Sequence, residues 1–138
     1  MATNGLKKTL AAMERVKQAA KEAAMQRLIK GAGDVAAAQR QLAPEDTGAL
    51  ADSITVTLPG QSTPPYSQPG GNRVASENQV IVTAGNAEVR YAHLVEHGTS
   101  KTEAQPFFFP AYRLYRDRVK RSVASAFGRA ARKEWSRR

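Results

Sequence analysis

The sequence predicts an α+β fold in which a long helix at each end of the chain accompanies a small antiparallel sheet. Apolar residues recur at spacings of three and four near both ends, and short stretches between them alternate polar and apolar residues. A stretch rich in Pro, Gly and Ser interrupts the alternating region. The order helix, strands, helix is typical of an α+β layer arrangement. At 138 residues the chain suits one domain, residues 1–138.

The first helix is predicted over residues 5–39. Its apolar stripe consists of Leu6, Leu10, Met13, Val16, Ala20, Ala24 and Leu28, and lysines and arginines fill the opposite side. Pro44 prevents the helix from continuing. The residues that follow, Asp46, Thr47 and Gly48, favour a turn: the first two can bond backbone amides, and glycine accepts a positive φ.

A sheet is predicted over residues 50–98, with a long Pro/Gly-rich loop at 59–76. The alternation in 53–58 and the β-branched run in 79–83 predict two strands. Residues 88–95 are expected to form a third, giving an antiparallel sheet of about three or four strands. Residues 92–96 could instead form a helical turn. Gly98 and Thr99 are expected to end this region.

The second long helix is predicted over residues 110–135, followed by a short tail at 136–138. Its apolar stripe consists of Tyr112, Tyr115, Val119, Val123, Ala126 and Ala130. Pro106 and Pro110 are expected to keep Phe107–Phe109 extended until the helix starts.

The small number of large apolar residues indicates that neighbouring copies of the chain supply part of the hydrophobic core. Leu, Ile, Val and Phe total 25 residues, or 18% of the chain, and chains below about 20% that also carry a high net charge approach disorder. An uninterrupted helix over residues 6–30 would be ~38 Å long, comparable to the diameter of the whole globule. We therefore expect spare apolar and alanine surface to meet other subunits.

The net charge of +9 is unevenly distributed along the chain. Residues 1–42 carry +5, residues 43–109 carry −4 and residues 110–138 carry +8. Such a field can serve contact with nucleic acid, or it can dock one copy's end onto another copy's middle.

Several classes of protein are excluded or disfavoured. The chain has no cysteine, which excludes disulfides and thiolate metal sites. It has no apolar run approaching the ~20 residues of a membrane span. Its first residues lack the apolar segment of a signal peptide, which favours synthesis in a cytoplasm. No cofactor is expected.

Two motifs suggest proteases. Asp46-Thr47-Gly48 spells the aspartic-protease signature, in which two aspartates share a proton across a dimer. Here, however, it follows the end of a helix and not an apolar strand, so a structural turn is the better interpretation. His93-Leu94-Val95-Glu96-His97 matches the H-x-x-E-H zinc-protease pattern. Gly98 would end any helix directly after it, and the small domain offers no usual cleft, so surface histidines are favoured.

Three phrases in order resemble a known family. They are A-P-E-D-T-G-A-L-A-D-S-I at 43–54, Y-A-H-L-V-E-H-G-T at 91–99 and Q-P-F-F-F-P-A at 105–111. Their combination resembles a family of tail-component, tail-completion or head-to-tail joining proteins of long-tailed bacteriophages. The residues that carry the resemblance are Asp46, Thr47, Gly48, Tyr91, Glu96, Gly98, Thr99, Pro106, Phe107 and Pro110.

The resemblance implies a structural protein of the virion neck that forms a ring, with a hexamer as the expectation, and that has no enzymatic activity. Its expected partners are head-closure or adaptor proteins and tail-terminator or tail-tube proteins, with DNA passing nearby. We expect a subunit interface on the last helix at Tyr112, Tyr115, Arg116, Val119, Lys120, Arg121 and Val123, whose charges would meet Glu88, Glu96 or Glu103 of another copy. A basic nucleic-acid-binding protein is the alternative.

Overall fold

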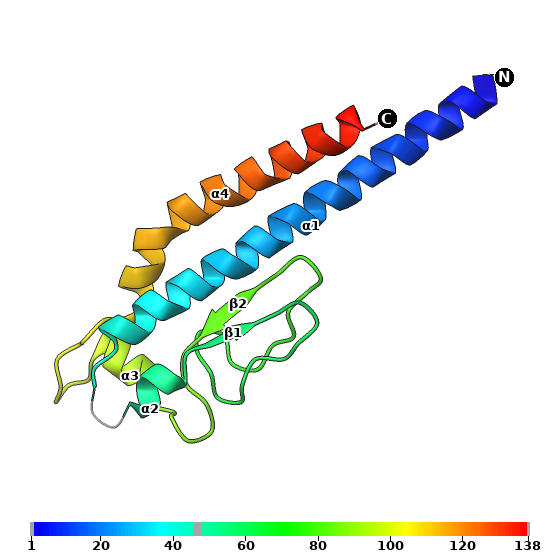
Figure 1. Cartoon of the computed structure of the whole chain (residues 1–138). Helices are drawn as coiled ribbons and strands as arrows, with labels where there is room; N and C mark the ends of the chain where they lie inside the picture. The colour runs from blue at the N-terminus through cyan, green and yellow to red at the C-terminus, as the bar shows by residue number, and fades with distance from the viewer. Residues whose placement is uncertain (1, 46–47, 138) are drawn as a thin grey trace. The chain divides into compact units, whose positions relative to one another are not determined.

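The structure is a computed structural model that describes residues 2–45 and 48–137. In chain order its elements are α1 (Ala2–Leu42), α2 (Ala49–Asp52), β1 (Thr55–Thr57), β2 (Ile81–Thr83), α3 (Ala92–His97) and α4 (Phe108–Ser136), as Figure 1 shows. The α+β class and the two long terminal helices are confirmed. The chain divides into two compact units. We call Met1–Leu28 with Arg118–Arg138 the helical unit, and Ile29–Asp117 the core unit.

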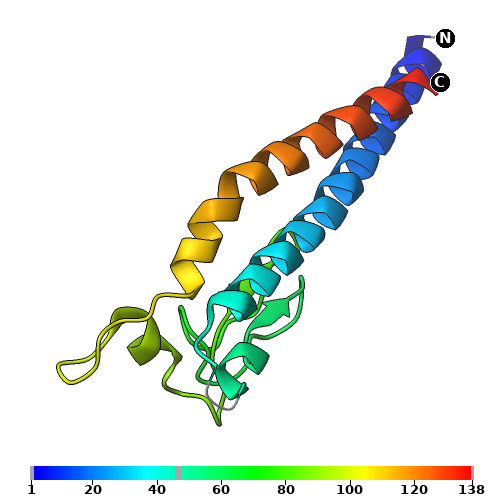
Figure 2. The same ribbon diagram turned by 60° about the vertical axis from the view of Figure 1, so that its left-hand side comes forward.

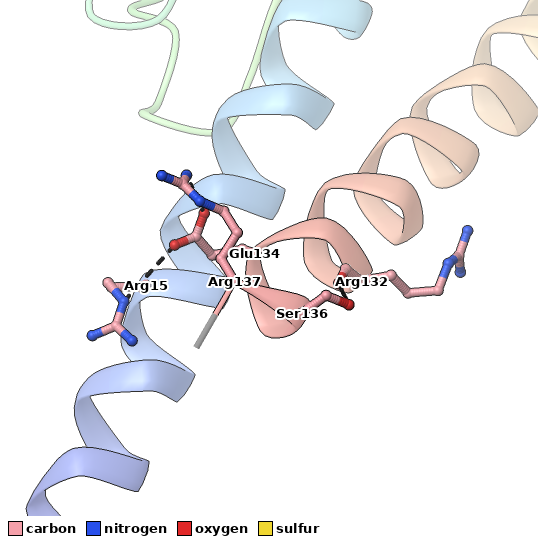
Figure 3. Close-up of polar contacts among 5 residues, drawn as sticks. All are labelled: Arg15, Arg132, Glu134, Ser136 and Arg137. Carbon is pink, nitrogen blue, oxygen red and sulfur yellow. Dashed lines mark hydrogen bonds and ion pairs between the residues drawn. The ribbon is translucent and has the colours of Figure 1, made fainter.

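The helical unit consists of the first part of α1 and the last part of α4. Among its described residues the buried side chains are all small: Ala12, Ala20 and Ala126. Glu134 of α4 lies between two arginines, 3.8 Å from Arg15 of α1 and 3.2 Å from Arg137 (Figure 3). This unit therefore buries little apolar surface of its own.

The core unit contains the main hydrophobic cluster. The cluster draws on every helix and on the segments that flank the strands, and its buried members are Ala36, Ala43, Leu50, Ile54, Ala84, Val89, Ala92, Phe107 and Phe108. Phe107 and Phe108 are its two largest members, and their rings meet edge to face at 6.4 Å. The first turn of α4 is thereby fixed to the core.

Within residues 2–45 and 48–137 the sheet has two strands, so the prediction of three or four is wrong. β1 and β2 pair antiparallel, with Thr55 opposite Thr83, Val56 opposite Val82 and Thr57 opposite Ile81. The predicted third strand at 88–95 is replaced by a turn and by α3, so the helical alternative for residues 92–96 is the correct one.

Local hydrogen bonds explain why residues 88–95 do not extend. The side chain of Asn86 accepts the backbone N–H groups of Glu88 and Val89, which curls the chain after β2. The carbonyl of Tyr91 then accepts the N–H groups of Leu94 and Val95, which starts α3. Residues 88–95 are too few for their pattern of polar and apolar residues to distinguish a strand from a helix with one buried face.

Two further boundaries differ from prediction. Residues 49–52 form the short helix α2, so the sheet region begins at Thr55 and not at residue 50. The helix α4 begins at Phe108, so Phe108 and Phe109 are helical and not extended. Pro110 lies within the first turn of α4, where a backbone N–H has no partner inside the helix and its loss costs nothing.

The Pro/Gly-rich segment between β1 and β2 has no helix or named strand, but it is braced. The Thr63 hydroxyl accepts the N–H of Arg73 and donates to the carbonyl of Gly71, at 2.9 and 3.0 Å. Further along, Gln68 and Ala84 exchange two backbone hydrogen bonds. The ring of Tyr66 lies 3.8 Å beneath the guanidinium of Arg90.

Candidate functional site

Glu96 connects α3 to the start of α4. Its side chain is buried, and one carboxylate oxygen, Oε1, accepts the backbone N–H groups of Phe107 and Phe108 at 2.9 and 2.8 Å. Oε2 lies 3.4 Å from the N–H of Phe109. These groups begin α4 and have no partner inside the helix, and the positive end of the helix dipole favours a carboxylate there. Glu96 therefore caps α4 from eleven or more residues upstream.

Gly98 and Thr99 turn the chain between α3 and α4. Gly98 has φ 78° and ψ 173°, a conformation almost restricted to glycine. A Cβ atom at this position would lie 2.7 Å from the backbone nitrogen of Ala104. The hydroxyl of Thr99 accepts the N–H groups of Lys101 and Thr102. Gly98 and Thr99 therefore follow the helix α3 and not the third strand that the sequence predicted.

The other residues of the three phrases lie nearby or outside the described part. Asp46 and Thr47 lie outside the described residues. Gly48 precedes α2 with φ 81°, as a turn glycine requires. Tyr91 precedes α3, and Pro106 is exposed immediately before the buried Phe107. The structure thus brings Glu96, Gly98, Phe107 and Pro110 together around the start of α4.

The motif His93–His97, which resembles a zinc-protease site, has a structural role in this fold. His93 and His97 are exposed on α3, which ends at His97 as expected from Gly98. The carboxylate between them, Glu96, is committed to the amides of α4. Within residues 2–45 and 48–137, no group of three or more His, Cys, Asp or Glu side chains is placed to hold a metal ion.

The expected interface residues are distributed along α4. Tyr112, Arg116, Lys120 and Arg121 are exposed, whereas Tyr115, Val119 and Val123 are half-buried within the chain. Of the acidic residues expected to meet them, Glu88 and Glu103 are exposed. Glu96 is buried and engaged, so it cannot serve as a surface partner.

Large apolar side chains remain exposed on both parts of the helical unit. On α1 they are Leu6, Leu10 and Met13, each more than half exposed, and on α4 they are Phe127 and Trp135. The first three belong to the apolar stripe that the sequence predicted for the first helix.

The net charges of the two structural units differ more than the net charges of the sequence segments do. By residue count the helical unit carries +11 and the core unit −2. The sequence showed basic ends, but it could not show that both ends fold into one unit. No helix of the described chain is long and apolar enough to span a membrane.

A groove beside β2 is the feature that sequence reasoning missed. It has a volume of about 360 Å³ and lies between the Gln79–Val82 segment, Pro69 with Arg73, Val35 and Gln39 of α1, and the first turns of α4. Gln39, the last residue of the predicted first helix, is fully buried. A glutamine on the apolar face of that helix was the available signal.

Comparison with known proteins identifies a family. A family profile, the HK97-gp10-like family described as a tail component of bacteriophage HK97, matches residues 7–98. Neither a curated protein nor a solved structure matches the chain significantly. The matched segment runs from the first turns of α1 through α3.

Proposed function

The chain belongs to the HK97-gp10-like family of bacteriophage tail components, and from this membership we propose that it is a ring-forming structural protein of the virion neck. In this role it is a tail-completion or head-tail joining component without catalytic activity. Family membership assigns it to the virion. The ring, the position in the neck and the absence of catalysis are our proposal.

The exposed apolar surface of the helical unit is the observation that carries this proposal. Leu6, Leu10, Met13, Phe127 and Trp135 are between 38% and 58% exposed. Leu6, Leu10 and Met13 recur at helical spacing on α1, and an exposed apolar stripe of this kind marks protein–protein contacts. A structural protein with many such contacts forms a closed ring most simply, and a ring that caps a sixfold tail inherits sixfold symmetry.

The separation of charge supports a head-to-tail arrangement of copies. A helical unit of +11 and a core unit of −2 attract one another between molecules more than either unit attracts its own kind. The exposed cations Lys120 and Arg121 of the helical unit are suited to such a contact with the exposed Glu88 and Glu103 of the core unit. Arg116, also exposed on α4, belongs to the core unit and would lie at the edge of this contact. Adjoining neck and tail proteins would occupy the ring's two faces.

The histidine-containing protease motif does not support an enzymatic alternative. The carboxylate of Glu96 accepts two short backbone hydrogen bonds and is buried, so it has no free access to substrate or metal. That arrangement gives Glu96 a structural purpose independent of catalysis.

The oligomeric state tests the proposal. We expect mass photometry of the purified protein, free or mixed with its neighbouring neck proteins, to give a discrete ring mass, and electron microscopy to give closed rings. Particles made without the protein should carry heads and tails that fail to join. A protein that stays monomeric under all these conditions, with intact joined particles in its absence, would contradict the proposal.

Nucleic-acid binding is the second candidate, and one observation favours it. On α4, Arg121, Arg129 and Arg132 are exposed and recur at helical spacing on one side, and arginine suits bidentate contact with phosphate. Binding to random duplex DNA that falls steeply with salt would support this function. Ring formation without DNA affinity would exclude it.

A further inference from the structure

The two histidines of the chain lie one helical turn apart on α3. His93 is the second residue of this helix and His97 is its last, and the sequence contains no other histidine. The N–H of Gly98 bonds the carbonyl of Leu94 at 2.7 Å, so the helical turn is complete through His97. Residues four apart on a helix lie on one side, with Cβ atoms about 5–6 Å apart. The two imidazoles therefore belong to the same side of α3.

Both imidazoles border one hollow in the surface of the core unit. The hollow has a volume of about 110 Å³, and Ala84 and Phe107 are among the residues that line it together with the two histidines. The ring of His97 also meets the ring of Phe109, with 6.3 Å between the centroids. In Figure 2, α3 is the short yellow-green helix beside the loop that leads to α4. His93 and His97 thus face one common space.

The ring nitrogens of His93 and His97 have no hydrogen-bond or ion-pair partner within residues 2–45 and 48–137. Both side chains are exposed. Glu96, which lies between them in the sequence, is committed to the amides of α4 and does not compete for them. Histidine with a free ring nitrogen is the commonest metal ligand in proteins. The pair therefore offers two nitrogen ligands that the fold does not use.

We propose that His93 and His97 form a chelating site for one divalent transition-metal ion of the zinc, nickel and copper group. Imidazole nitrogen suits these metals, and two histidines four apart on one helix face can bind a single zinc ion. The proposal goes beyond the proposed function and does not depend on a ring, because both ligands come from one chain.

The site binds a metal ion but lacks the ligand set of a zinc protease. In the described part of the chain no third His, Cys, Asp or Glu side chain is placed to join the pair, whereas catalytic zinc sites have three protein ligands. Water fills the other coordination positions. Mg²⁺ and Ca²⁺ prefer oxygen ligands, so they are poor occupants.

The bound ion stabilises α3 and, through it, the start of α4. A helix of six residues is too short to be stable by itself, and the ion joins residues near its two ends. Glu96 belongs to this helix and accepts the N–H groups of Phe107 and Phe108. An ion that binds the folded chain and not the unfolded chain raises the stability of the fold.

Isothermal titration calorimetry tests the site on the full-length protein, prepared without a polyhistidine tag. We expect NiCl₂ and ZnCl₂ to bind at one ion per chain and MgCl₂ to give no binding. His93→Ala and His97→Ala should each weaken the binding of Ni²⁺ about 100-fold, because the second imidazole binds in an intramolecular step. One Ni²⁺ per two chains would show an ion shared between copies and would overturn the proposal.

A relocated histidine is the matched control. Glu77→His combined with His93→Ala keeps two histidines, but Glu77 is exposed between β1 and β2 and does not line the hollow. This variant should bind Ni²⁺ as weakly as His93→Ala alone. Wild-type affinity in the relocated variant would show that the spacing on α3 does not determine binding, which also overturns the proposal.

Spectroscopy and thermal melting give independent readouts. Electron paramagnetic resonance of the Cu²⁺-loaded protein should show two imidazole nitrogens in the wild type and one in His93→Ala. Excess Ni²⁺ should raise the melting temperature of the wild type by several degrees and leave that of His93→Ala nearly unchanged. Circular dichroism confirms that both proteins are folded before they are compared. Absence of binding by the wild type at millimolar Ni²⁺, or an equal rise in melting temperature in both proteins, would overturn the proposal.

Discussion

One carboxylate joins two parts of the core unit that an exposed loop separates. Glu96 accepts the N–H groups of Phe107 and Phe108, which are eleven and twelve residues further along the chain. The same two residues anchor the first turn of α4 in the hydrophobic cluster. The position of α4 therefore depends on Glu96 as well as on apolar packing.

Removal of this carboxylate should destabilise the fold. We expect Glu96→Ala to lower the free energy of unfolding by about 2–3 kcal/mol, because it leaves buried amides without acceptors. Glu96→Gln keeps an acceptor but loses the charge, so its cost should be smaller, about 1–2 kcal/mol. Urea denaturation followed by circular dichroism measures both. Glu103→Ala, on the exposed loop, is the control, and an equal loss there would contradict the cap.

Gly98 should be equally intolerant of a side chain. With φ 78°, ψ 173° and the Ala104 nitrogen 2.7 Å from the Cβ position, we expect Gly98→Ala to cost about 1–3 kcal/mol. Gly33→Ala is the matched control: Gly33 is exposed in α1 with nothing within 4 Å of the Cβ position. There we expect a gain of about 0.5–1 kcal/mol. The same sign for both substitutions in thermal melts would refute the backbone argument.

For single residues, the sequence predicted which ones are structurally important more successfully than it predicted what each one does. It singled out Glu96, Gly98 and Phe107 by resemblance, and the structure places all three around the start of α4. It did not predict that Glu96 is a helix cap, because the cap lies eleven residues before its partners and capping patterns are local in sequence. Gln39 was missed because a polar residue in a helical pattern is usually solvent-exposed.

At the scale of elements, hydrogen bonds from single side chains decide where regular structure stops. Asn86 turns the chain after β2, so α3 forms where a third strand was expected. Periodicity located the long helices because each offers many repeats. It could not distinguish strand from helix over residues 88–95, where eight residues fit either period.

The segment between β1 and β2 should be ordered in the free protein through Thr63. Thr63→Val removes the bonds to Gly71 and Arg73 but keeps the shape of the side chain. We expect it to cost about 1–3 kcal/mol locally, since it leaves the Arg73 amide unpaired. Hydrogen exchange of residues 61–75 should accelerate. Ser62→Ala, an exposed neighbour, should leave exchange unchanged, and equal protection in the wild type and Thr63→Val would show that other contacts hold the segment.

At the scale of the whole molecule, charge and exposed apolar surface coincide on the helical unit. Its charge of +11 opposes close approach of like units and favours contact with acidic surfaces. Exposed ion pairs contribute only ~0–1 kcal/mol each, so they set register, and apolar residues supply most of the attachment.

Charge reversal on α4 should therefore impair assembly more than folding. We expect Arg116→Glu, Lys120→Glu and Arg121→Glu together to weaken assembly strongly and to leave the thermal melting of the monomer nearly unchanged, because all three are exposed. Partial rescue by reversing Glu88 or Glu103 would identify the partner surface. If the reversed protein assembles normally but particles fail to retain or eject DNA, α4 faces the channel and the protein–protein interpretation is wrong.

The cap at Glu96 also has a consequence for how the gene can be cut. The family profile ends at residue 98, two residues after the carboxylate but before the amides that it binds. An expression fragment that stops at this boundary would retain the Glu96 carboxylate without the amides that it binds. It would also lack Phe107 and Phe108 of the hydrophobic cluster. Truncations or fusion tags should therefore be placed beyond Asp117, where the core unit ends. For this chain, the boundary of sequence similarity is not a boundary at which the protein can be divided.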